Sequence, residues 1–203
     1  RPLELGADIT VQSATKFLAG HADLLAGVAA TNDPDLAVLL HRGQLVSGAL
    51  LPPIDSYRLL QDVKTLALRL ERQQQNAREL IEFLSERPEV EKIFYAGSSS
   101  EEQAEVQSRQ ARGIGSVFSL LLKDGGDAQA FARSLPIFVN AVSLGGIESL
   151  VSLPAHTTHG AYAQEHRDEF GVDDRLVRLA IGIEDVQDLI AALEIGLKAA
   201  FAG

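Results

Sequence analysis

The chain has 203 residues, of which 46% are hydrophobic, and its 28 acidic and 18 basic side chains give a net charge of −10. That much apolar mass is typical of a globular protein with a hydrophobic core. The negative charge excludes the class of proteins that bind nucleic-acid phosphates through a basic surface, and no apolar run is long enough to span a membrane. The chain has no cysteine, which excludes disulfides, thiolate metal sites and cysteine nucleophiles and agrees with a cytoplasmic location.

The chain also has no methionine, and its first residue is Arg1. Because a translated chain normally starts with methionine, we expect a processed or truncated piece of a longer protein. The alternative is a small protein released from a tag. The first residues, RPLELGAD, lack the apolar core of a secretory signal.

The first third of the chain predicts two strands and a helix. Residues 8–12 alternate between apolar and polar side chains, as a half-buried strand does, and residues 24–31 have almost no polar interruption, which predicts a strand buried on both faces. Asp33 is placed to cap a helix that starts at Pro34 and runs to about Arg42. Residues 43–56 contain two glycines and two adjacent prolines, which predict a loop or a broken helix.

The longest periodic stretch runs from about Ser56 to Arg87 and predicts a helix. Its apolar residues recur at helical spacing: Leu59, Leu60, Val63, Leu66, Leu70, Ala77, Leu80, Ile81 and Leu84. Pro88 cannot continue a helix and marks its end. A helix of this length is more typical of a strut between two domains than of a single core element.

The rest of the chain alternates between strands and helices. Strands are predicted at 90–97, 115–122, 138–143 and 175–184. A helix is predicted around Ala128 to Ser134, and Asp185 is placed to cap a final amphipathic helix. A polar connection follows the first of these strands, and residues 144–172 are rich in loop residues. This order predicts a small α/β domain whose sheet is covered on one side.

Lys16 lies in the stretch VQSATKFL (11–18), after the first predicted strand. Lysine can form a Schiff base with a carbonyl, and pyridoxal phosphate has an aldehyde for this reaction and a phosphate that needs hydroxyl and amide donors. In an extended segment the hydroxyls of Ser13 and Thr15 would point to the same side and could serve one phosphate. Gly20 would let the backbone approach a bulky cofactor. The alternative is a solvated lysine at the end of a strand.

Arg178 and Ser143 are candidates for binding an anion. Arg178 lies mid-strand between Val177 and Leu179, so its guanidinium needs an anion or a path to water. A substrate carboxylate would accept two parallel hydrogen bonds from it, and a structural salt bridge is the alternative. Ser143 ends a predicted strand before Leu144 and two glycines, where free backbone donors could bind an anion. The alternative there is an ordinary turn.

The histidines do not form a metal-binding pattern. His156 and His159 are three residues apart, and His21 is two residues from Asp23. Neither pair provides the three or four ligands that zinc requires. We therefore predict no metal site and interpret these histidines as hydrogen-bonding residues of loops.

Four long stretches resemble those of the pyridoxal-phosphate-dependent transsulfuration enzymes of cysteine and methionine metabolism. This family includes cystathionine γ-synthase, the cystathionine β- and γ-lyases, methionine γ-lyase and the O-acylhomoserine sulfhydrylases. The stretches are PLELGADITVQSATKFLAGHADLLAG (2–27), LLQDVKTLALRLERQQQNA (59–77), AVSLGGIESLVSLPAHTTH (141–159) and RLVRLAIGIEDVQDLIAALE (175–194). They keep the family's order and spacing and cover nearly all of the chain.

The resemblance implies a role for individual residues. Lys16 matches the lysine that carries pyridoxal phosphate covalently and later moves protons between substrate carbons. Ser13 and Thr15 match hydroxyls that bind the cofactor phosphate. Arg178 matches the arginine that pairs with the α-carboxylate of the amino-acid substrate, and Ser143 matches a residue that helps to hold the same carboxylate.

The resemblance also implies an α/β fold, namely the C-terminal part of a fold-type I pyridoxal-phosphate-dependent transferase. Residues 1–62 would be the end of the large cofactor-binding domain, and residues 63–203 would be the small C-terminal domain with its long linking helix. Family members are about twice as long as this chain. The implied partners are therefore the N-terminal half of the same protein, further copies in a homotetramer and an amino-acid substrate.

Within the family, the sequence favours a carbon–sulfur lyase that performs β- or γ-elimination on a sulfur amino acid such as cystathionine or methionine. Val142 stands where γ-synthases and γ-lyases commonly have a glutamate associated with the distal amino group of cystathionine, which implies a less polar distal pocket. GGIESL (145–150) resembles the cystathionine enzymes instead. The alternatives are a γ-replacement enzyme, of the cystathionine γ-synthase or sulfhydrylase type, and a non-catalytic assembly domain.

Overall fold

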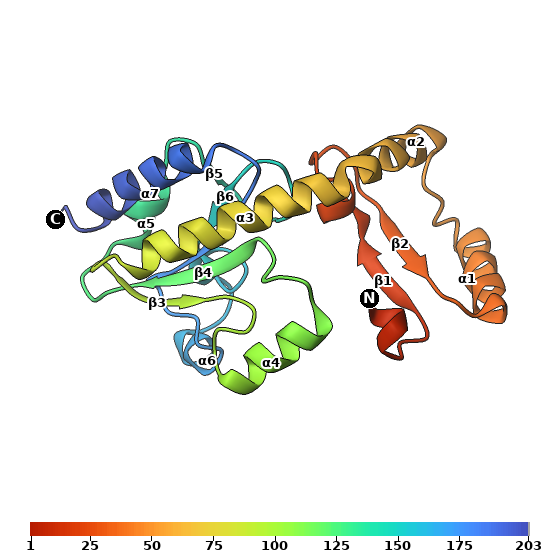
Figure 1. The fold of residues 1–203 in the computed structure, drawn as a ribbon, viewed down its shortest axis with the longest axis horizontal. Coiled ribbons are helices and arrows are strands. Elements are labelled where there is room, and N and C mark those ends of the chain that lie inside the picture. Colours follow the sequence, from red (N-terminus) through yellow and green to blue (C-terminus); the bar gives the residue numbers. More distant parts are fainter. Residues whose placement is uncertain (203) are drawn as a thin grey trace.

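The computed structural model describes residues 1–202 and has two parts joined by one long helix, α3 (Figure 1). The first part consists of the 3-10 turn η1 (Pro2–Leu5), strand β1 (Thr10–Ser13), the π-helical turn η2 (Ala14–Leu18), strand β2 (Gly27–Ala30), α1 (Pro34–Ser47) and α2 (Pro53–Asp62). The strands β1 and β2 pair antiparallel, with Thr10 opposite Ala30 and Ser13 opposite Gly27. Both predicted strands are therefore present, and each is shorter than its apolar pattern. The burial predicted for both faces of the second strand is wrong, because every residue of β2 is exposed.

Helix α1 begins as predicted and ends later. The Asp33 carboxylate accepts hydrogen bonds from the backbone N–H groups of Asp35 and Leu36, which satisfies two of the free donors at the helix start. The helix continues past Arg42 through Gly43, because one glycine weakens a helix without breaking it. It ends at Gly48, whose φ of +70° is the left-handed conformation that favours glycine.

The single helix predicted from Ser56 to Arg87 is wrong. The structure has α2, a 3-10 turn η3 (Val63–Thr65) and then α3 (Leu66–Ser85). The Thr65 hydroxyl and the Arg69 guanidinium both donate to the carbonyl oxygen of Asp62, which tightens the chain at this point. The periodicity could not reveal the break because a 3-10 turn barely disturbs it.

The second part is built on a five-stranded sheet. Its elements are β3 (Val90–Phe94), α4 (Glu101–Gln110), β4 (Val117–Leu122), α5 (Ala128–Arg133), β5 (Val139–Asn140), β6 (Leu150–Ser152), the 3-10 turn η4 (Pro154–His156), α6 (Gln164–Glu169), β7 (Leu176–Ala180) and α7 (Val186–Ala200). The strand order is β3-β4-β7-β6-β5, and only β5 and β6 run parallel. Helices α4 and α6 and strand β6 lie in stretches expected to be loops.

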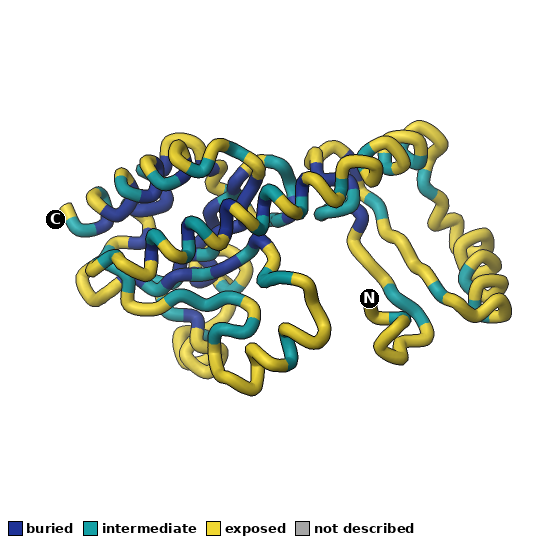
Figure 2. Tube along the Cα trace, viewed as in Figure 1, coloured by how far each residue is buried: buried dark blue, intermediate teal, exposed yellow. Residues whose placement is uncertain are grey.

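The hydrophobic core lies between one face of this sheet and the helices α3, α5 and α7. Buried side chains alternate along the strands, for example Phe118, Leu120 and Leu122 on β4, and they pack against Leu80 and Leu193 of the helices. The Asp185 carboxylate accepts a hydrogen bond from the Gln187 N–H and caps α7, as predicted. The second part therefore has a core of its own, which appears as the dark blue region in Figure 2.

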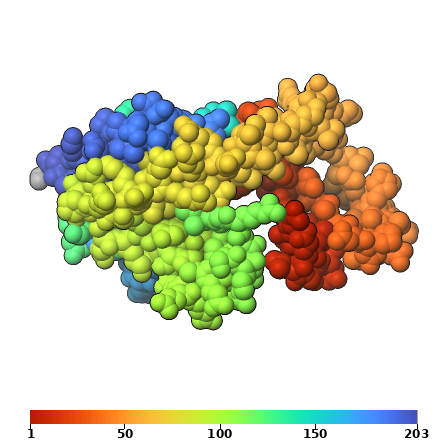
Figure 3. Space-filling view, in the orientation of Figure 1, coloured from red at the N-terminus to blue at the C-terminus, as the bar shows by residue number. Residues whose placement is uncertain are grey.

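The first part has no comparable core. Strand β2 is exposed along its whole length, and apolar side chains on this part face solvent, among them Leu25 and Val46 with exposed fractions of 84% and 82%. Figure 2 shows this part mostly as exposed chain, with buried residues where it meets α3. The N-terminal turn η1 also lies beside the chain that follows α4 (Figure 3). None of the helices within residues 1–202 combines the length and the hydropathy needed to cross a membrane.

Candidate active site

Two of the predicted site residues meet. The Lys16 Nζ donates a hydrogen bond of 2.6 Å to the Oγ of Ser143, although the two residues are 127 positions apart in the sequence. Lys16 comes from the turn η2, and Ser143 comes from the loop between β5 and β6. The amine is thus held by a neutral hydroxyl, and it forms no salt bridge with the carboxylates of the described residues.

Both partners lie on unusual backbone. Lys16 has φ −90° and ψ −125°, which is outside the helical region although its neighbours form a helical turn. Ser143 has a φ of +138°, a conformation that L-residues rarely adopt. The strain at Ser143 persists only where the surroundings enforce it, and such strain is frequent at functional sites.

A glycine brings these two segments close together. Gly145 has a φ of +85°, and a Cβ built on it would lie 2.6 Å from the backbone N of Phe17 and 2.9 Å from the carbonyl carbon of Lys16. Any larger residue would therefore push the loop away from the lysine turn. The sequence suggested that the two glycines expose backbone donors to an anion, and the structure instead uses Gly145 for close packing.

A cavity of about 590 Å³ opens beside Ser143, and Lys16 reaches its edge only through the hydrogen bond to Ser143, because Lys16 itself is not among the lining residues. Its lining includes Thr15 and Ser143, the apolar side chains of Leu24 and Leu144, and the backbone of Gly146. Three carboxylates, of Asp23, Asp55 and Glu148, also line it. The sequence did not single out these acids as site residues, because they come from three separate segments and form no recognisable pattern.

The hydroxyls of Ser13 and Thr15 differ in their surroundings. Ser13 is the last residue of β1 and is exposed, whereas Thr15 lies inside the turn η2. The alternation expected of an extended segment therefore does not apply to this pair. The Oγ1 of Thr15 accepts a hydrogen bond of 3.0 Å from the N–H of Ala26 while it lines the cavity.

Gly20 is close to a side chain of this protein. It has a φ of +77°, and a Cβ on it would overlap the Arg69 guanidinium. The close approach predicted at Gly20 is present, and the side chain that lies against this glycine is that of Arg69.

The structure does not bring Arg178 to the cavity lining. Arg178 lies in β7, opposite Ser119 of β4 and Ser152 of β6. Its side chain points to the sheet face opposite the core, because its strand neighbours Val177 and Leu179 are fully buried. Within residues 1–202 its guanidinium forms no hydrogen bond or salt bridge.

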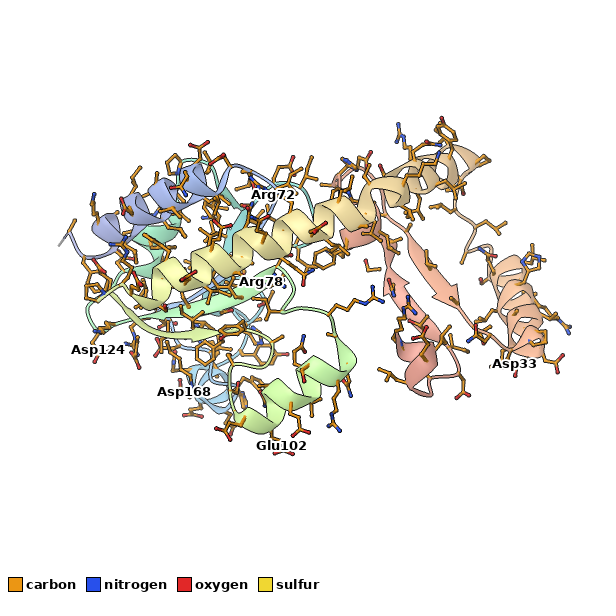
Figure 4. The ribbon with its side chains drawn as sticks, in the orientation of Figure 1. Asp33, Arg72, Arg78, Glu102, Asp124 and Asp168 are labelled. Atoms are coloured by element: carbon orange, nitrogen blue, oxygen red, sulfur yellow. The ribbon has the colours of Figure 1, made fainter. Side chains whose placement is uncertain are left out.

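The other predicted residues lie apart from the cavity or on loops. Val142 is exposed beside Ser143 and does not line the cavity. His159 packs with the rings of Tyr162 and Phe170, at centroid distances of 5.8 and 6.2 Å. His21 bonds to the carbonyl oxygen of Ala19 and lies 3.0 Å from Asp62. The charged side chains Asp33, Glu102, Asp124 and Asp168 lie at the periphery of the molecule (Figure 4).

Comparison with known proteins gives the family. A family model described as "Cys/Met metabolism PLP-dependent enzyme" matches residues 1–198. The chain belongs to this family. It is 42% identical over 198 residues to a chloroplastic cystathionine β-lyase of Arabidopsis thaliana, covering 98% of this chain and 43% of that protein. It is 44% identical over 202 residues to an L-methionine γ-lyase of Pseudomonas deceptionensis, covering 98% and 50%.

Solved structures of relatives confirm the predicted fold class. The fold matches a cystathionine γ-lyase from Lactobacillus plantarum complexed with L-serine with a TM-score of 0.92, at 37% identity, over 98% of this chain and 52% of that one. It matches a cystathionine γ-synthase from Xanthomonas oryzae pv. oryzae, complexed with aminoacrylate and cysteine, with a TM-score of 0.91 at 36% identity, over 99% and 52%. The chain spans about half the length of the relatives it matches.

Proposed function

We propose that this chain forms part of a pyridoxal-phosphate-dependent carbon–sulfur lyase that performs β- or γ-elimination on a sulfur amino acid such as cystathionine or methionine. The products would be a thiol, ammonia and a 2-oxo acid. The observation that carries the proposal is the contact between Lys16 Nζ and Ser143 Oγ at the edge of a cavity. Membership of a pyridoxal-phosphate-dependent family supports it.

The residues at the cavity fit the cofactor. A primary amine with only a hydroxyl partner is available for a carbonyl group, and the hydroxyl of Thr15 lines a space of about 590 Å³. Pyridoxal phosphate, when bound, supplies an aldehyde for the lysine and a ring that withdraws electrons from the substrate. We infer that Lys16 is its covalent attachment point and that Ser13 and Thr15 hold its phosphate.

The chain's own residues would then bind the substrate and move its protons. The Arg178 guanidinium would pair with the α-carboxylate of the substrate, and the hydroxyl of Ser143 would help to hold the same group. Lys16 Nζ would take the proton from the substrate α-carbon and return one later in the reaction. Ser143 already bonds to this amine and so fixes its direction before substrate arrives.

We infer that activity needs a second half of the protein. The first part of this chain exposes the apolar side chains of β1, β2 and α1, which a complete domain would cover. We propose that residues 1–62 belong to that larger cofactor-binding domain and residues 63–203 to a small domain with its linking helix. The cytoplasmic location and the homotetramer expected from the sequence remain predictions.

A γ-replacement enzyme is the second candidate, because a cystathionine γ-synthase is among the structures that match at 36% identity. The complete protein should be given cystathionine, methionine, and O-succinylhomoserine with cysteine in separate assays. Release of ammonia and 2-oxo acid from the first two supports the lyase. Replacement products alone would rule it out in favour of the synthase type.

The role of Lys16 has a direct chemical test. The complete protein, incubated with pyridoxal phosphate and then freed of unbound cofactor, should stay yellow, and borohydride followed by peptide mapping should find the reduced cofactor on Lys16. Lys64, which is exposed and bonds to Gln61, is the control position and should stay unmodified. A protein that is colourless once the excess cofactor has been removed would contradict the enzyme and favour a non-catalytic assembly domain.

A further inference from the structure

Helix α3 has a row of buried polar side chains on one face. Arg69, Gln73 and Asn76 are spaced by four and three residues, so they lie along one side of the helix. Arg69 has an exposed fraction of 5%, and the other two are fully buried. The stretch of α3 between Arg72 and Arg78, both labelled in Figure 4, carries Gln73 and Asn76.

Each of the three side chains bonds to the backbone of a different segment. Arg69 donates to the carbonyl oxygens of Phe17 and Leu18, at 2.9 and 3.2 Å. Gln73 donates to the carbonyl oxygen of Gly146 at 2.6 Å.

Asn76 donates to the carbonyl oxygens of Gly182 and Glu184, at 3.2 and 2.9 Å. The three segments are the lysine turn, the glycine loop that follows Ser143, and the chain that leaves the strand of Arg178.

The same segments also bond to one another. The Ile147 N–H donates to the carbonyl oxygen of Gly20, which joins the glycine loop to the lysine turn. The Ser149 N–H and hydroxyl both donate to the Glu184 carboxylate, which joins the loop to the chain after β7. The three segments therefore contact one another as well as α3, which is their common support.

Stability alone does not account for this row. Gln73 Oε1 and Asn76 Oδ1 are buried and have no hydrogen-bond partner within residues 1–202. A half-satisfied buried amide is unfavourable, whereas an apolar side chain at position 73 would continue the helix's hydrophobic repeat. Burial also lowers the pKa of the Arg69 guanidinium, an effect that the negative charge of Asp62 partly offsets. The buried polar residues of α3 are therefore better explained by the positions in which they hold the three segments.

We propose, on the basis of the function proposed above, that Arg69, Gln73 and Asn76 are positioning residues that fix Lys16, Ser143 and Arg178 relative to one another. Gln73 is central, because it holds the loop that carries the hydroxyl partner of the lysine amine. Loss of its bond would let the loop shift, which would move Ser143 Oγ away from Lys16 Nζ. Misplacement of a reacting group by about 1 Å can lower a rate by about a hundredfold.

The test compares Gln73→Met with Gln75→Met in the complete protein. Methionine keeps the length of glutamine and removes its donor, and Gln75 is an exposed glutamine of the same helix whose side chain bonds only to Glu79. Without cofactor, Gln73→Met should speed hydrogen exchange in residues 143–149, where the Ile147 N–H is bonded to Gly20. Gln75→Met should leave this exchange unchanged.

With pyridoxal phosphate bound, Gln73→Met should lower kcat by about tenfold to a hundredfold with a smaller change in KM. Asn76→Leu, which frees the chain after Arg178, should instead raise KM more than it lowers kcat. Leu84→Ala removes a buried side chain from the far end of α3 and serves as the control for lost stability. At a temperature where the Leu84→Ala variant stays folded, its kcat and KM should equal those of the unmodified protein.

The proposal is overturned if Gln73→Met and Asn76→Leu change the melting temperature as Leu84→Ala does and leave kcat and KM unchanged. It is also overturned if Gln73→Met does not speed exchange in residues 143–149. The exchange measurement needs no activity. A complete protein that processes no sulfur amino acid would thus reject the proposed function, and the exchange result would still decide whether Gln73 positions the loop.

Discussion

Gly20→Ala is expected to be one of the most damaging single substitutions in this chain. Gly20 has a φ of +77°, and a methyl group there would overlap the Arg69 guanidinium. The left-handed conformation costs a residue with a Cβ roughly 1–2 kcal/mol. Displacing Arg69 would also break its bonds to Phe17 and Leu18, and hydrogen bonds to a charged group contribute about 1.5–3 kcal/mol each. We therefore expect a loss of at least about 4 kcal/mol.

The matched control is Gly48→Ala. Gly48 has a φ of +70°, and nothing lies within 4 Å of a Cβ built on it. Its substitution should cost only the conformational term of about 1–2 kcal/mol. Urea unfolding of the complete protein gives both values. In an Arg69→Met background the difference between the two substitutions should disappear, because the group that occupies the space is gone. Equal losses for Gly20→Ala and Gly48→Ala in the unmodified protein would refute the reasoning.

Three further outcomes are expected. Lys16→Ala should lower kcat by at least about two to four orders of magnitude, the usual contribution of a positioned proton-transfer group, while the melting temperature stays close to that of the unmodified protein. Arg178→Ala should reduce transition-state stabilisation by about 2–4 kcal/mol, as calculated from the fall in kcat/KM with any substrate that the complete protein accepts. The Arg175 guanidinium, by its hydrogen bond, holds the pKa of Asp173 below its ordinary value. Asp173 therefore contributes stability above its unfolded-state pKa of about 4 and loses it as the pH falls through the lower folded-state value, so Asp173→Asn should flatten this acid limb of the stability curve.

The sequence predicted most of the elements that have an apolar face. Strand β4 alternates buried and half-buried residues, and α7 combines an Asp cap with an apolar stripe, so both could be recognised. Helix α4 was missed because it has no buried residue. Its start nevertheless had a signal, since the Ser100 hydroxyl accepts from the Gln103 N–H, as in a typical helix cap.

The candidate site could be predicted in its parts but not in its arrangement. Lys16 and Ser143 were both singled out, yet only the fold shows that their side chains touch. The prediction for Thr15 assumed an extended chain, which a tertiary contact with Ala26 overrides. The sequence did mark Gln73 as unusual, because a glutamine at this position interrupts the apolar repeat between Leu70 and Ala77. Its partner, a carbonyl oxygen of Gly146, could not be inferred from any pattern.

The row on α3 also limits where the length of this protein can vary. Inserting one residue between Arg69 and Asn76 would turn the rest of the helix by about 100°, because an α-helix has 3.6 residues per turn. Asn76 would then face away from Gly182, although its own identity had not changed. We therefore expect insertions and deletions to accumulate in connections such as residues 95–100, and the spacing between the three row positions to stay constant.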